Sequence, residues 1–173
     1  MLRFVAILIG ASLAVAIVGA ACGGNGDSGE SLTLEQYFQQ LQEADGRASA
    51  RFAQIRAQLD QAPQDDPEAA LRALKDIFPE QVVTLQDLVD SMEGLNPPPQ
   101  VEDAHNAAVD ALKDSIEIAE QNSDAMQDIT SPQDASDILS SQEAAAADQA
   151  TSLTCLALEK AGTDLAITVD LDC

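Results

Sequence analysis

Apolar residues recur at helical spacing along residues 32–162, and short corners containing Pro or Ser-Pro divide this stretch into four segments. The first segment begins at Thr33, which has the spacing of a capping box with Gln36, and it runs to about Leu59. The second begins with Asp66 as N-cap and Pro67 as first helical residue. Each start therefore carries its own local helix signal.

The second segment continues in phase across Pro79 and ends at Gly94, which predicts one helix kinked at the proline. The third runs from about Pro99 to Asp128. The fourth segment is predicted to form a single helix with Ser131 as its N-cap. Gly162 directly follows the last turn of this helix and is its predicted C′ residue. The inward stripe predicted for this fourth helix is Ala135, Ile138/Leu139, Ala145/Ala146, Leu153 and Leu156.

Segments of about 30 residues make helices about 40–45 Å long. Four amphipathic helices of matched length with short corners predict an all-α fold, an up-down-up-down four-helix bundle over residues 33–162. Within residues 163–173, apolar and polar residues alternate with period two from Leu165 onward, through Ile167, Val169 and Leu171. This pattern predicts an extended C-terminal tail that lies along the bundle.

Charge and composition exclude several classes of function. The 173 residues include 8 Lys and Arg against 30 Asp and Glu, a net charge of −22, which argues against nucleic acid as a partner. With no Trp, one Tyr and one His, few residues suit catalysis or ligand stacking. The sequence lacks a G-x-S-x-G elbow, a phosphate-binding glycine loop and an EF-hand loop. We therefore expect a non-enzymatic protein without a cofactor.

The N-terminal residues have the layout of an export signal. Arg3 precedes an apolar run over residues 4–18, and Gly19-Ala20-Ala21 supplies small residues before Cys22. A Gly-rich linker over residues 22–32 follows. This arrangement resembles the lipobox of bacterial lipoproteins. The resemblance implies removal of residues 1–21, lipid on Cys22, and anchoring outside the bacterial cytoplasm; the alternatives are an uncleaved anchor helix or a free Cys22.

The number of cysteines bears on these alternatives. If Cys22 carries lipid, Cys155 and Cys173 remain, and an exported protein can join them in a disulfide. The bond would close a loop of 19 residues and contribute about 3 kcal/mol in the chain-entropy model. It would also tie the tail to the bundle.

Two further candidate sites have both a functional and a structural interpretation. Glu102 and His105 have the Glu-x-x-His spacing of metal-binding bundles, but with one His the second such pair is missing, which favours a structural histidine. Five of the eight basic residues gather near the first corner. They could form a docking end for an anionic partner, or they could neutralise nearby Asp and Glu side chains. They are Arg47, Arg51, Arg56, Arg72 and Lys75.

These observations predict a lipid-anchored bundle that binds, senses or assembles with an envelope protein or small ligand, with the metal-binding bundle as the alternative.

Overall fold

The computed structural model describes residues 31–62 and 66–173, and these residues contain five helices and no strand. The helices are α1 (Leu34–Asp60), α2 (Pro67–Glu93), α3 (Glu102–Asp128), α4 (Pro132–Leu139) and α5 (Gln142–Asp164). The predicted all-α class is confirmed. The predicted export signal and Cys22 lie outside the described residues.

The predicted starts of the first, second and fourth helices are confirmed, whereas α3 begins at Glu102, three residues after the predicted Pro99. Gln36 N donates to Thr33 Oγ1 at 3.2 Å while Thr33 N donates to Gln36 Oε1 at 3.1 Å, a complete capping box. Asp66 Oδ1 accepts from two backbone N–H groups at the start of α2, which continues through Pro79 to Glu93. Each cap satisfies backbone donors that have no partner within the helix.

The fourth predicted helix is wrong as a single element, because it is divided into α4 and α5 at Ser140–Ser141. Ser140 ends α4, with both its N–H and its hydroxyl donating to Ser136 O. Ser141 then caps α5 by accepting the N–H of Ala144 at 3.1 Å. Two adjacent serines offer the backbone local partners that compete with a continuous helix.

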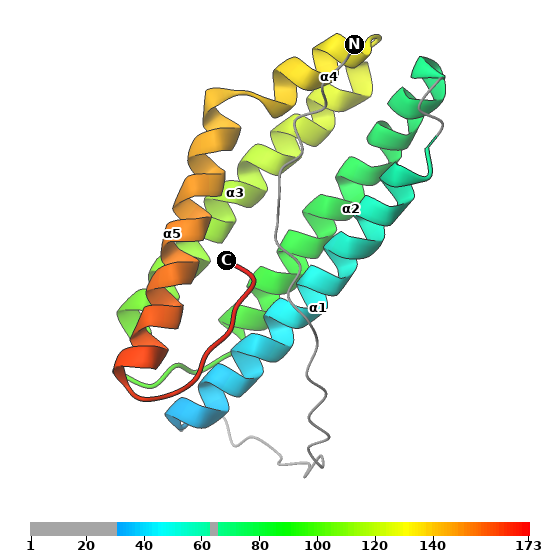
Figure 1. The fold of residues 1–173 in the computed structure, drawn as a ribbon. Helices are drawn as coiled ribbons and strands as arrows, with labels where there is room; N and C mark the ends of the chain where they lie inside the picture. Colours follow the sequence, from blue (N-terminus) through cyan, green and yellow to red (C-terminus); the bar gives the residue numbers. More distant parts are fainter. Residues whose placement is uncertain (1–30, 63–65) are drawn as a thin grey trace.

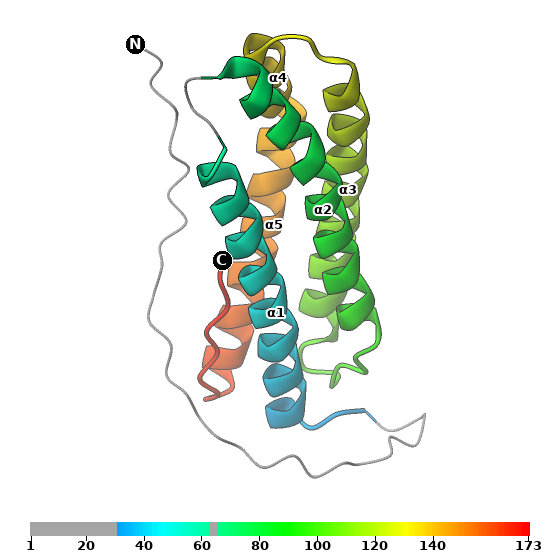
Figure 2. The ribbon, with the colours of Figure 1, turned by 90° about the vertical axis from the view of Figure 1, so that its right-hand side faces the viewer.

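The long helices pack as successive pairs, α1 on α2, α2 on α3 and α3 on α5 (Figure 1). The C-terminal tail, residues 165–173, occupies the seam between α1 and α5 (Figure 1). α4 covers the far end of α2 and α3 (Figure 2). At this end Phe78, Met126 and Ile129 form a smaller apolar cluster. The main core is formed by Tyr37, Phe38, Leu41, Val89, Met92, Val101, Ala108, Val109, Leu112, Leu158 and Leu171.

The end of α5 differs from the prediction. Gly162 lies inside the helix, and α5 ends two residues later, at Asp164. The αL position is occupied by Ala166, with φ 60°, whose N–H donates to Thr163 O, and Ile167 N donates to Gly162 O. This is a Schellman closure. The tail therefore begins at Leu165.

The extended tail predicted from the period-two pattern is confirmed. Ile167, Val169 and Leu171 pack on the core, and the residues between them are exposed. Cys155 and Cys173 form a disulfide with Cα atoms 5.6 Å apart, as predicted. The tail is thereby fixed to α5 at its last residue.

The predicted inward stripe is also wrong over α5. Leu153 and Leu156 are 59% and 51% exposed, whereas Leu158 is buried. The side of α5 that faces the bundle includes Thr151, whose hydroxyl lies 2.8 Å from Ser115 Oγ on α3, and it includes Cys155. α5 is a new helix with its own N-cap at Ser141, so its orientation is independent of the helix before it. The side that faces the bundle is the one that carries the disulfide and contacts the tail, and Leu153 and Leu156 lie on the other side.

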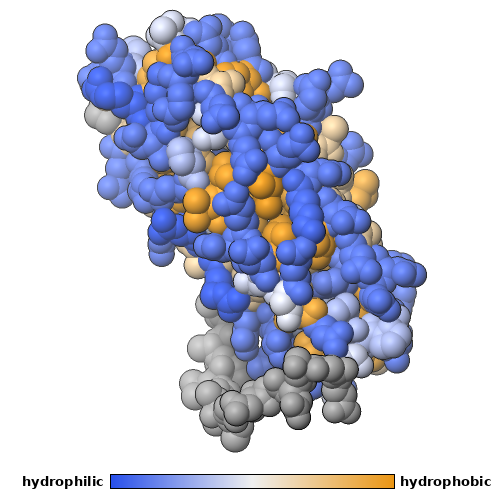
Figure 3. Space-filling model, turned by 180° about the vertical axis from the view of Figure 1, so that it is seen from behind, coloured by the Kyte–Doolittle hydropathy of each residue, from blue (hydrophilic) through white to orange (hydrophobic). Residues whose placement is uncertain are grey.

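The surface seen from behind is mostly hydrophilic, with apolar side chains showing in a narrow band (Figure 3). None of the five described helices is long and apolar enough to cross a membrane.

Candidate functional site

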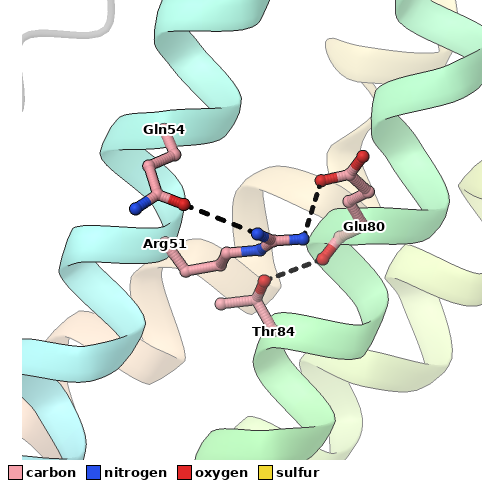
Figure 4. A network of polar contacts seen from close by, with 4 residues as sticks. All are labelled: Arg51, Gln54, Glu80 and Thr84. Atoms are coloured by element: carbon pink, nitrogen blue, oxygen red, sulfur yellow. Dashed lines mark hydrogen bonds and ion pairs between the residues drawn. The ribbon is translucent and has the colours of Figure 1, made fainter.

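The basic residues near the first corner are mostly engaged within the protein. Arg51 of α1 lies between Gln54 and Glu80, with its Nη2 3.0 Å from Glu80 Oε2 (Figure 4). The backbone carbonyl of Glu80 accepts the hydroxyl of Thr84 at 2.7 Å, within the same network (Figure 4). Arg51 therefore links α1 to α2 across a half-exposed ion pair.

The other four cations do not converge on one point. Arg72 lies 3.9 Å from Glu68 on its own helix, and Arg47 donates to Ser91 Oγ at 3.5 Å. Lys75 Nζ donates to Gln127 O at 2.7 Å, which satisfies a carbonyl at the end of α3. Arg56 is exposed on α1. The pairing of Arg51 and Arg72 with carboxylates favours the intramolecular interpretation of this group.

A buried polar pair lies at the opposite end of the bundle. Tyr37 is 0% exposed and His105 is 4% exposed, and a hydrogen bond of 3.0 Å joins Tyr37 Oη to His105 Nδ1. Burial raises the pKa of the Tyr37 hydroxyl and lowers the pKa of the His105 imidazole. Both groups are therefore held neutral at neutral pH, so the hydrogen bond joins an uncharged hydroxyl to an uncharged imidazole.

A surface hollow of about 330 Å³ borders His105 where α2 ends and α3 begins. Glu102 lines it, together with Glu93 and Lys113, whose Oε1 and Nζ atoms lie 2.5 Å apart. The described residues contain no group of three or more His, Cys, Asp or Glu side chains placed to hold a metal ion. Glu102 and His105 thus share a hollow without forming a ligand set.

Carboxylates gather where the tail meets α1 and α5. Asp45 Oδ2 accepts the N–H of Asp172 at 3.0 Å, and Glu159 Oε1 accepts the N–H of Leu171 at 2.9 Å. Burial raises the pKa of Asp45; the hydrogen bond from Asp172 opposes this effect, and the charges of Asp172, Glu159 and Asp170 add to it. The acids hold the tail by hydrogen bonds while repelling one another.

The sequence pattern alone does not single out Tyr37 or Asp45. Tyr37 lies in the first helix at a position that fits the apolar face, and Asp45 is one of 30 acids. The only sequence signal for Tyr37 and for Asp45 is that each is a polar residue at the edge of an apolar helix stripe. Their partners lie 68 and 127 residues away in the sequence, which helical periodicity cannot reveal.

No protein-family model, no curated protein and no solved structure matches this chain.

Proposed function

We propose that this chain is a non-enzymatic bacterial lipoprotein that displays a helical binding module outside the cytoplasmic membrane. In this proposal lipid on Cys22 holds the chain at the membrane, and α1, α2, α3 and α5 act as an up-down-up-down four-helix unit. Its partner is an envelope protein or a small ligand. No nucleic acid, metal or cofactor is part of the proposal.

The observation that carries the proposal is the disulfide between Cys155 and Cys173. Structural disulfides persist in oxidising compartments and are rare in the cytosol. The bond accounts for two of the three cysteines. The third, Cys22, directly follows the small residues Ala20 and Ala21. A lipid thioether on Cys22 would remove the last free thiol.

The bundle supports a binding role more than a catalytic one. The single histidine has its Nδ1 hydrogen-bonded to Tyr37 within the core, where burial lowers its pKa and keeps it neutral. A general base needs to reach a substrate proton and to titrate near the working pH. His105 is instead placed to satisfy a buried hydroxyl.

The experiment is metabolic labelling of the full chain with a palmitate analogue in a bacterial host, followed by detection of the label on the protein. The wild type should be labelled and Cys22→Ser should lose the label completely. The matched control is Cys155→Ser/Cys173→Ser, which removes the other two cysteines and should keep it. An unlabelled wild type, or a label retained in Cys22→Ser, would refute the lipid anchor.

A further inference from the structure

Over residues 145–157, the outer side of α5 is exposed and carries no carboxylate. Leu153 and Leu156, the two exposed large apolar residues of α5, are 59% and 51% exposed. From residue 145 to residue 157, the other exposed side chains on this side are small or neutral and include Ala145, Ala146, Gln149, Ala150 and Ala157. These seven residues are called the α5 outer face. Contiguous apolar surface of this kind marks contact sites on soluble proteins.

The α5 outer face has the spacing of a helix-packing seam. Ala146, Gln149, Leu153, Leu156 and Lys160 follow one another at alternating steps of three and four residues. This is the heptad a/d repeat through which one helix packs against another. Within the bundle α5 uses its opposite side, which carries Thr151, Cys155 and Leu158. Among the described residues, the α5 outer face is therefore not used in packing.

The charges around the seam define its partner. Glu143 and Asp148 are exposed on α5 on either side of it, and residues 97–173 contain 16 acids and two bases. Both bases are already paired, Lys113 with Glu93 and Lys160 with Asp164. A helix that packs on the seam consequently meets uncompensated negative charge along both edges.

We propose that the α5 outer face binds an amphipathic helix of a partner protein, one that carries a leucine-type stripe flanked by Lys or Arg. The alanines allow the partner's backbone to approach to about 8 Å between helix axes, and the two leucines insert between its apolar side chains. A second copy of this chain fits less well, because each copy carries a net charge of −22. The inference rests on the binding role proposed above, and not on the lipid anchor.

The test uses the full chain with its disulfide intact and a fluorescent 21-residue peptide made of three repeats of LQKLAQK. Binding is followed by anisotropy in 0.15 M NaCl. We expect saturable binding that Leu153→Gln/Leu156→Gln weakens at least tenfold. The matched control is Val83→Gln, because Val83 is 53% exposed on α2, and its affinity should stay within twofold of the wild type. Both sites are exposed, so these variants should keep the wild-type melting temperature.

The charge part of the proposal has its own pair of variants. Glu143→Gln/Asp148→Asn should weaken binding several-fold and flatten its salt dependence. Glu35→Gln/Asp60→Asn removes the same charge from α1 and should change the affinity less than twofold. A peptide with Glu in place of each Lys should not bind.

Three results would overturn the proposal: no saturable binding to the wild type, equal binding by Leu153→Gln/Leu156→Gln, or equal binding of the acidic peptide. A dimer in sedimentation that Leu153→Gln/Leu156→Gln dissociates would also overturn it, because a second copy then covers the face. Palmitate labelling and peptide binding, both measured on the wild type, separate the two proposals. A labelled wild type that fails to bind the peptide refutes only this inference, and an unlabelled one that binds refutes only the lipid anchor.

Discussion

A Cβ atom at Gly162 would lie 2.2 Å from Cγ2 of Val169, so the tail crosses α5 directly over a residue without a side chain. The same Cβ would lie 3.1 Å from Phe38 Cζ on α1. Gly162 is thus a point of close approach between α5, the tail and α1. Its lack of a side chain lets the tail fill the seam between α1 and α5.

Alanine should have opposite effects at two helical glycines. Gly162→Ala should lower the free energy of unfolding by about 1–3 kcal/mol, because Val169 must move from a packed position. Gly46 lies in the middle of α1, and a Cβ atom there would meet no neighbouring side chain within 4 Å. Gly46→Ala should therefore raise stability by about 1 kcal/mol. Urea unfolding of both variants measures this, and a stabilising Gly162→Ala would contradict the close contact.

The pair of Tyr37 and His105 should be costly to break. Tyr37→Phe keeps the ring in the core but leaves the Nδ1 of a buried His105 without its partner. The loss should be about 1–3 kcal/mol, the cost of an unsatisfied buried group. Thermal unfolding at pH 7.5 measures it, with Val83→Gln as a control for a substitution at the surface. An unchanged stability would show that water replaces the hydroxyl.

The same pair predicts a loss of stability in mild acid. Burial lowers the folded-state pKa of His105 below its usual value of about 6.5. The unfolded chain then binds the proton first, so this contribution is complete above about pH 6.5 and is lost as the pH falls toward the folded pKa. The melting temperature should fall between about pH 7.5 and 5.5 in the wild type. His105→Gln should remove that slope, and a slope that persists in this variant would assign it to other groups.

The helices and their starts were predictable because their signals are local. Thr33 with Gln36, Asp66 with Pro67, and Ser131 each lie within a few residues of the backbone groups that they cap. The break at Ser140–Ser141 was missed because apolar periodicity passes over it. The phase of α5 was missed for a related reason, since Cys155 and Gly162 must face a tail whose path no local pattern encodes.

The candidate site was less predictable than the fold. The Cys155–Cys173 pairing followed from counting cysteines, and it is the one long-range contact that the sequence indicated. Tyr37 with His105 and Asp45 with Asp172 join segments far apart in the chain. Such contacts depend on which helices lie side by side and in which register. The spacing of apolar residues along one helix does not determine this.

Neutralising Asp45 should stabilise the protein at neutral pH. Its folded-state pKa is raised by burial and by the nearby charges of Asp172, Glu159 and Asp170, against the hydrogen bond from Asp172. A raised carboxyl pKa means that the ionised group opposes folding above that pKa, and the penalty disappears as the pH falls through it. Asp45→Asn keeps an oxygen that can accept the N–H of Asp172.

The melting temperature of Asp45→Asn should therefore exceed that of the wild type at pH 7.5, and the two should converge near pH 3. Asp114→Asn removes the same charge from an exposed position in the interior of α3 and should give a smaller gain. A destabilised Asp45→Asn at neutral pH would mean that the carboxylate charge, rather than its oxygen, holds the tail.

Salt should stabilise the whole bundle. The chain carries a net charge of −22, and the packed helices bring these charges closer together than the unfolded chain does. The four ion pairs among the described residues are all at least partly exposed. Exposed ion pairs contribute little to the free energy of unfolding, so little stability is lost when salt screens them. Screening shortens the reach of repulsion from about 10 Å at 0.1 M salt to about 3 Å at 1 M. The repulsive contribution should therefore dominate the response.

We expect the melting temperature at pH 7.5 to rise from low salt to about 0.5 M NaCl, within this screening regime. Millimolar CaCl₂ should act only to the extent that its ionic strength does, because the described residues contain no cluster of three metal-ligating side chains. A flat or falling melting temperature in NaCl would show that the acids are already compensated in the fold. A steep, saturable rise with CaCl₂ alone, absent with MgCl₂ at the same ionic strength, would instead reveal a discrete calcium site.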